Sequence, residues 1–158
     1  MKLAVHFHGE LRSVASQSEI PSLMDEILGG DPTYASATWM VLGSGEASNP
    51  ISFLEFRANP DTGFGGVVWF AGDQDLGSVQ NPTERKLREN FWVSESESPP
   101  DFDPDILSDP HVPSFFDSRG AIPIATLRDV VNEYCELFGG RPGGVKWVAG
   151  NQNGTRLD

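Results

Sequence analysis

Apolar residues recur along the chain with two different periods, and each period predicts its own kind of element. Between residues 20 and 28 apolar side chains return every three or four positions, and Gly29-Gly30 ends the run. This spacing predicts an amphipathic helix with Ser18 as its N-cap. A broader apolar face predicts a second helix over residues 124–138, which two further glycines close. Both helices are expected to face a core.

Six other stretches are rich in β-branched and aromatic residues or alternate between apolar and polar positions, and they predict strands. They are residues 2–8, 37–42, 51–57, 64–71, 90–94 and 145–148. The separator at residues 59–63 contains Pro and Gly, which favours an antiparallel hairpin. We therefore predict an α+β fold, with a mixed, mostly antiparallel sheet packed against two main helices. In this interpretation residues 1–148 form a single domain, and residues 149–158 form a polar, frayed C-terminal tail.

Residues 94–118, called the acidic segment below, differ from the rest of the chain. They hold seven Asp and Glu, five Pro and no Lys or Arg. Proline blocks helix continuation and repelling carboxylates keep a chain extended, so we predict a loop within the domain. The whole chain has a formal charge of −12. Such a surface argues against direct nucleic-acid binding and attracts basic partners. Charge alone leaves open that the acidity only keeps the protein soluble.

The composition also limits where the protein is expected to work. No apolar run approaches the roughly 20 residues that a membrane span needs. The N-terminus lacks the longer apolar stretch of a signal peptide. The only cysteine, Cys135, cannot form an internal disulfide, and its place on or near a helix's apolar face favours packing over nucleophilic chemistry. These features predict a cytoplasmic protein that does not bind membranes.

The motifs that could carry catalysis or bind a metal are each incomplete. His6 and His8 share one face of a predicted strand, but a metal site needs further ligands, and no spacing in the sequence supplies them. Residues 101–105 begin like a calcium loop, but its sixth and twelfth positions hold Ile106 and Val112 instead of Gly and Glu. We predict no catalytic residue, no bound metal and no cofactor.

Two alternative functions stay open at this point. One is a hydrolytic or metal-dependent enzyme that uses the aspartates of the acidic segment. The other is a non-enzymatic small-ligand-binding module in which Trp39, Trp69 and Trp92 form an aromatic platform.

The C-terminal block carries a family resemblance. Its pattern runs Ile122-Pro123, Val131-Asn132-Glu133-Tyr134, Gly139-Gly140-Arg141-Pro142 and Val145-Lys146-Trp147. This pattern resembles the closing pattern of immunity protein family one of bacterial polymorphic toxin systems. The resemblance implies an α+β domain that binds and neutralises the toxin domain encoded beside it. Toxins of such systems include deaminases and nucleases, so a nucleic-acid-acting toxin is expected. The acidic segment is longer and more acidic than the family pattern, which favours a partner-specific insertion over the alternative of an ordinary solvated surface loop.

Three residues of this block are interpreted as structural. We expect Arg141 to form a local salt bridge, Pro142 to fix the turn and Trp147 to pack in the core against the last helix.

Charge and resemblance together predict where the toxin binds. An acidic surface would cover a basic active site, with charge setting the association rate and aromatic side chains the residence time. The predicted toxin-interface residues are Trp92, Glu95, Glu97, Asp101, Phe102, Asp103 and Asp105. Phe115 and Phe116 are expected to pack in the core instead. Residues 43–46 and 72–75 are the alternative interface.

Overall fold

One antiparallel sheet runs through the molecule. The computed structural model describes residues 2–43, 50–71, 87, 90–111 and 113–158. The sheet has the strand order β10-β6-β5-β4-β3-β1-β2, with β9 paired to β5, and every pairing between described strands is antiparallel. Its strands are β1 (Lys2–Phe7), β2 (Glu10–Ser13), β3 (Ala35–Leu42), β4 (Pro50–Asn59), β5 (Phe64–Ala71), β6 (Phe91–Glu95), β9 (Ile122–Pro123) and β10 (Lys146–Gly150).

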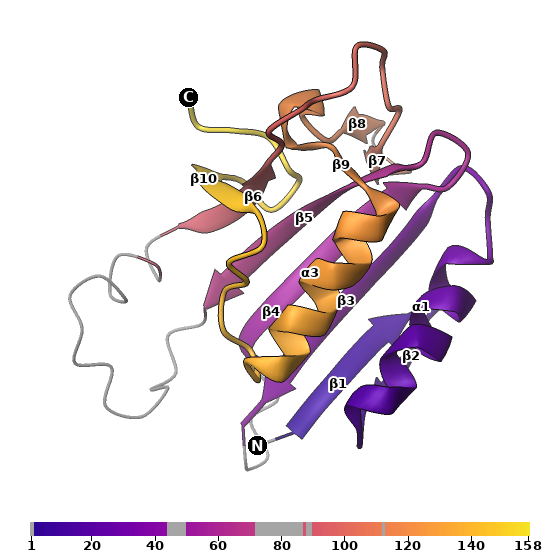
Figure 1. The fold of residues 1–158 in the computed structure, drawn as a ribbon, viewed down its shortest axis with the longest axis vertical. Coiled ribbons are helices and arrows are strands. Elements are labelled where there is room, and N and C mark those ends of the chain that lie inside the picture. The colour runs from indigo at the N-terminus through magenta and orange to yellow at the C-terminus, as the bar shows by residue number, and fades with distance from the viewer. Residues whose placement is uncertain (1, 44–49, 72–86, 88–89, 112) are drawn as a thin grey trace.

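Two helices cover one face of this sheet (Figure 1). Helix α1 spans Ile20–Leu28 and helix α3 spans Ile124–Glu136. The residues that both helices turn inward pack against Trp39, Leu54 and Phe56, which the sheet presents from β3 and β4. Burial of these apolar side chains is the main force that holds the helices on the sheet. The predicted fold class, α+β with a mostly antiparallel sheet and two main helices, is confirmed.

The start of α1 differs from the prediction. A short 3-10 turn, η1 (Gln17–Glu19), precedes the helix, and Ser16 caps it. The Ser16 hydroxyl accepts a hydrogen bond from the Ser18 backbone N–H, and the Glu19 carboxylate accepts one from the Ser16 N–H. This reciprocal arrangement satisfies two backbone donors. The predicted N-cap Ser18 is therefore wrong by two residues.

A strand that the sequence pattern did not predict, β2, forms the edge of the sheet beyond β1. The two strands join through His8 and Gly9, whose φ angles are +50° and +77°. Positive φ at both central residues is the geometry of the tight hairpin turn that suits the twist of antiparallel strands. Gly adopts it without steric cost, whereas His is an uncommon residue for it.

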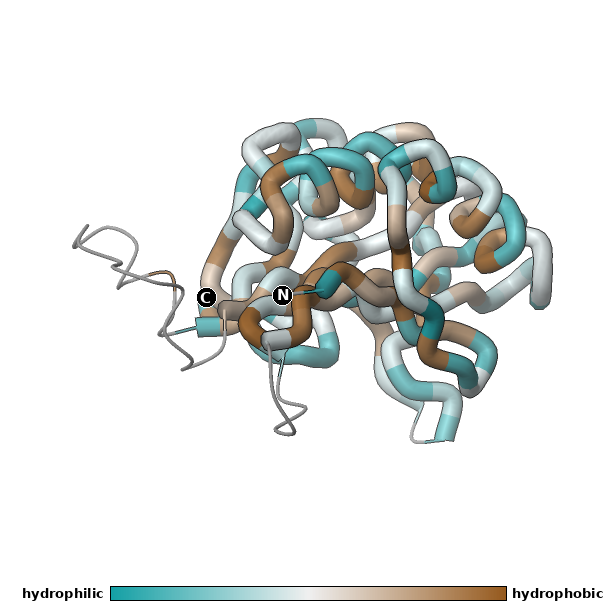
Figure 2. Tube along the Cα trace, turned by 90° about the horizontal axis from the view of Figure 1, so that it is seen from below, coloured by the Kyte–Doolittle hydropathy of each residue, from teal (hydrophilic) through white to brown (hydrophobic). Residues whose placement is uncertain are grey.

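The opposite face of the sheet is partly covered by the acidic segment. Within it, β7 (Leu107–Asp109) and β8 (Ser114–Phe115) pair as a small second sheet, and the turn η2 (Ser118–Gly120) follows. Figure 2 shows this hairpin projecting from the side of the sheet that faces away from the helices. Buried Ile106 and Phe116 pack there against Val68 and Val93. The segment is therefore not a loop throughout, because it carries its own apolar anchors.

The C-terminal tail folds back instead of fraying. Its backbone pairs with β10 through a bridge between Gly150 and Arg156. The Ser108 hydroxyl donates to the Asn153 carbonyl at 2.5 Å, which ties the tail to β7. Gly154, at φ +84°, passes so close to the Phe116 ring that a side chain at this position would overlap with it. The tail and the acidic segment thus support each other.

Candidate functional site

The exposed part of the acidic segment clusters three carboxylates along the sequence, on either side of an aromatic residue. Asp101, Asp103 and Asp105 are exposed, and Phe102 is 50% exposed. The Phe102 ring meets the Phe64 ring edge-on, with 5.6 Å between the ring centroids. One side of Phe102 is thus supported by the sheet while half of its surface stays accessible. An aromatic side chain of this kind, set among charges, is typical of protein-binding surfaces.

The backbone beneath these side chains is fixed to the hairpin between β4 and β5. The Asn59 side-chain amide donates to the Asp105 carbonyl at 3.0 Å, and the Thr62 hydroxyl donates to the Pro104 carbonyl at 2.7 Å. The Asp103 carboxylate accepts from the Asp105 N–H at 2.9 Å and supports the left-handed backbone of Asp105, at φ +51°. These bonds hold the exposed carboxylates on an ordered backbone.

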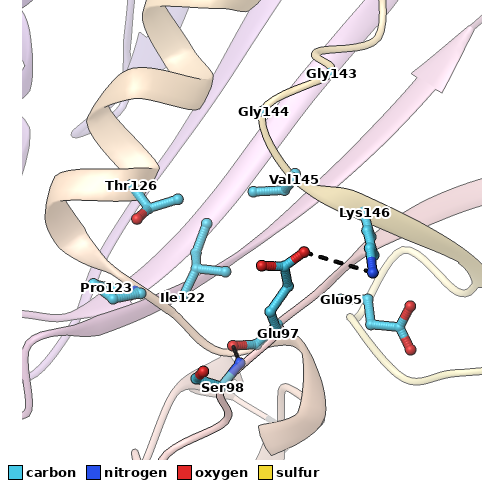
Figure 3. Close-up of a pocket in the computed structure, with 11 residues that line it drawn as sticks. Glu95, Glu97, Ser98, Ile122, Pro123, Thr126, Gly143, Gly144, Val145 and Lys146 are labelled. Carbon is cyan, nitrogen blue, oxygen red and sulfur yellow. Dashed lines mark hydrogen bonds and ion pairs between the residues drawn. The ribbon is translucent and has the colours of Figure 1, made fainter.

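Glu95 and Glu97 lie apart from that cluster, beside a cleft. Strands β6 and β10 stay paired as far as Glu95 and Lys146 and then diverge. The space between them, together with β9 and the start of α3, is a cleft of about 450 Å³. Figure 3 shows the Glu97 carboxylate turned toward the centre of this cleft, whereas the Glu95 carboxylate turns away from it. Glu95 instead pairs with Arg156 at 3.4 Å.

The other walls of the cleft are of two kinds. Ile122, Pro123 and Val145 supply apolar surface, and Lys146 supplies a cation whose Nζ lies 3.5 Å from the Glu97 carboxylate. The Lys146 and Glu97 side chains are 68% and 76% exposed, so water screens this ion pair strongly.

The structure places Trp92, Phe115 and Phe116 in three different environments. Trp92 is half-buried on the helix side of the sheet, and its indole N–H donates to the Leu87 carbonyl at 2.8 Å. The Arg141 guanidinium lies over this ring, with its central carbon 5.0 Å from the ring centroid. Phe116 is 4% exposed, as expected for a core residue, but Phe115 is 50% exposed, so its predicted core position is wrong. Successive residues of a strand point to opposite sides, which separates the two rings.

The turn after α3, residues 139–144, is held by contacts that the sequence did not reveal. The Glu133 carboxylate accepts hydrogen bonds from the Gly143 and Gly144 N–H groups, at 2.7 and 3.1 Å. The Trp147 indole donates to the Pro142 carbonyl at 2.7 Å. Arg141 forms no ion pair among the described residues and lies over Trp92 instead, so the expected salt bridge is wrong.

The start of this turn is bound to the sheet as well. Gly139, at φ +99°, lies just beyond the end of helix α3, and its carbonyl accepts from the Trp69 indole at 3.1 Å and from the Ser52 hydroxyl at 2.8 Å. A left-handed glycine at this position lets the chain leave the helix while its N–H bonds back to the Tyr134 carbonyl.

This C-terminal arrangement lies within a match to a known family. The family model described as Immunity protein Imm1 matches residues 8–149. The chain belongs to the Imm1 immunity protein family. The family resemblance of the C-terminal block is thereby confirmed, and membership indicates a toxin-neutralising protein whose partner is a cognate toxin. No match was found among curated proteins or among solved structures.

Several residues that carry the family resemblance fix this turn and bind it to the sheet. Family membership also favours a non-enzymatic inhibitor. The aromatic platform of the small-ligand alternative is not formed, because Trp39 is fully buried and Trp69 is 3% exposed. Cys135 is buried as predicted, and burial raises the pKa of its thiol to about 12.

Two further observations concern metals and membranes. Within the described residues, no three His, Cys, Asp or Glu side chains are grouped closely enough to hold a metal ion. In the same part of the chain, no helix is both long and apolar enough to cross a membrane. The alternative interface at residues 43–46 and 72–75 lies, except for Gly43, outside the described residues.

Proposed function

We propose that this chain neutralises a toxin that acts on nucleic acid, a deaminase or a nuclease, by covering its basic active site with the acidic segment. The observation that carries the proposal is that Asp101, Asp103 and Asp105, the sequence neighbours of half-exposed Phe102, are all exposed. Enzymes that act on nucleic acid attract phosphates with Lys and Arg. A surface that presents several carboxylates offers the same enzyme a competing partner.

The acidic segment suits this role because its shape is fixed before binding. The hydrogen bonds from Asn59 and Thr62 hold its backbone on the sheet. A segment that is already ordered loses little conformational entropy when it binds. Charge then raises the association rate, and Phe102, which has half of its surface free, contributes contact area that slows dissociation.

In this proposal Glu95 and Glu97 extend the acidic surface toward the cleft, and Trp92, half-buried on the helix side of the sheet, adds aromatic contact area to the interface. The proposed setting is the cytoplasm of the producing bacterium, where the chain protects the cell from the toxin of its own polymorphic toxin system.

Co-expression with the toxin domain encoded beside this chain tests the proposal. We expect a one-to-one complex that survives purification, and complete loss of the toxin's deaminase or nuclease activity at equimolar ratio. The control is an equally acidic immunity protein from another toxin system, which should not inhibit. A neighbouring toxin that forms no complex, or one that attacks a substrate other than nucleic acid, contradicts the proposal.

A further inference from the structure

We infer that the cleft between β6 and β10 binds one arginine side chain of the toxin, with Glu97 as the acceptor of its guanidinium. This inference rests on the proposed function, since it names a second contact of the same complex. It concerns a surface separate from the aspartates around Phe102.

The walls of the cleft match the two parts of an arginine side chain. Ile122, Pro123 and Val145 offer apolar surface on which an aliphatic stem can pack. The Glu97 carboxylate is turned toward the centre of the cleft (Figure 3). The hydroxyls of Ser98 and Thr126 also line the cleft and can accept further N–H groups. A guanidinium presents five donors in one plane and so can use several of these acceptors together.

The protein already places a cation of its own in this position. Lys146 lies 3.5 Å from the Glu97 carboxylate, which demonstrates that the cleft accommodates a positive charge at this point. Both side chains of the pair are largely exposed, so the pair is weak and its lysine can swing into solvent. An incoming guanidinium forms stronger, bidentate bonds to a carboxylate than an ammonium does. Lys146 therefore acts as a replaceable occupant that competes with the toxin's arginine.

A basic occupant is favoured over an acidic one by the surrounding charge. The chain carries −12, and Glu97 would repel a carboxylate that entered the cleft. The amide N–H groups of Gly143 and Gly144, which could otherwise bind an anion, are already used by Glu133.

Two substitutions of opposite effect test the inference. Glu97→Gln removes the acceptor charge and is expected to raise the Kd for the cognate toxin domain about 10-fold. Lys146→Gln removes the competing cation and is expected to lower the Kd about threefold. Both side chains are exposed, so the thermal midpoint should stay unchanged in both variants. Glu136→Gln, an exposed carboxylate on α3, is the matched control and should leave the Kd unchanged.

A titration that needs no toxin accompanies these measurements. N-acetyl-arginine amide should shift the amide NMR signals of residues 143–146, and N-acetyl-norleucine amide should not. Opposite changes of Kd in the two variants, together with the arginine-specific shifts, support the inference. Tighter binding by Glu97→Gln with weaker binding by Lys146→Gln, the pattern of an anionic occupant, overturns it. Equal weakening by both variants, which a structural ion pair would cause, overturns it too, as do unchanged Kd values. Loss of all binding to the toxin by the unmodified chain instead overturns the proposed function itself.

Discussion

The acidic segment and the turn after α3 use carboxylates in opposite ways. In the turn, the Glu133 carboxylate accepts two backbone N–H groups and fixes residues 143–144. In the acidic segment, Asp101, Asp103 and Asp105 are exposed to solvent. The turn contains residues that carry the family resemblance, and its carboxylate is used to fix the backbone. Those residues thus stabilise the fold, while the residues proposed to select the partner lie on its surface.

The acidic segment itself repeats this division on a smaller scale. Two of its apolar residues, Ile106 and Phe116, are buried against the sheet, whereas Asp101, Asp103 and Asp105 are exposed. Substitutions can therefore test the buried anchoring residues and the exposed, proposed recognition residues separately.

The largest effect is expected from the buried anchor. Phe116→Ala removes a ring that is 4% exposed and leaves a cavity beside Val68 and Val93, so the free energy of unfolding should fall by about 3 kcal/mol. Phe115→Ala, the matched control, removes a neighbouring ring that is half exposed and should cost less than about 1 kcal/mol. Urea unfolding of both variants measures the difference. Equal losses of unfolding free energy in the two variants would mean that Phe116 anchors the segment no more than Phe115 does.

A smaller effect is expected at the turn. Glu133→Ala leaves two N–H groups to water and should lower the free energy of unfolding by about 1 kcal/mol. Glu136→Ala removes an exposed carboxylate from the same helix and should change it by less than about 0.5 kcal/mol. Thermal unfolding of the two variants gives the comparison. A Glu133 variant as stable as the control would show that the turn does not depend on this carboxylate.

The smallest expected effect depends on pH. Arg119 donates hydrogen bonds to the Asp117 carboxylate and holds the pKa of that group below its usual value. Because the pKa is lower in the folded state, this pair stabilises the fold above about pH 4, and its contribution is lost as the pH falls through the folded value. Asp117→Asn should therefore flatten the decline of unfolding free energy below about pH 4.

The partner residue provides the control for this effect. Arg119→Gln should flatten the same decline of unfolding free energy at low pH, and the double variant should show no further flattening. If the unfolding free energy of Asp117→Asn declines with falling pH as steeply as that of the unmodified chain, other carboxylates cause the decline.

Much of the fold could be predicted because the main elements have strong periodic patterns. Helix α3 ends two residues before the predicted limit, and β5 has the predicted bounds. Strand β2 was missed because its four residues alternate weakly and its turn places His8 in a left-handed conformation.

The site was harder to predict, since its geometry depends on contacts between distant parts of the chain. Composition indicated the acidic segment, but nothing near it in the sequence shows that Asn59 and Thr62 hold its backbone. The separation of Glu97 from Asp101 likewise depends on where β6 and β10 diverge.

Association kinetics with the cognate toxin domain test the central claim most directly. The key variant neutralises Asp101, Asp103 and Asp105 together as asparagines. Its control neutralises three exposed carboxylates on the helix side, through Asp25→Asn, Asp129→Asn and Glu136→Gln, and so changes the net charge equally.

At low salt the key variant should associate about 10-fold more slowly than the unmodified chain and should lose much of the salt dependence, while the control changes little. Its free energy of unfolding should change by no more than about 1 kcal/mol. An association rate and salt dependence equal to those of the unmodified chain, or of the control, would contradict the account.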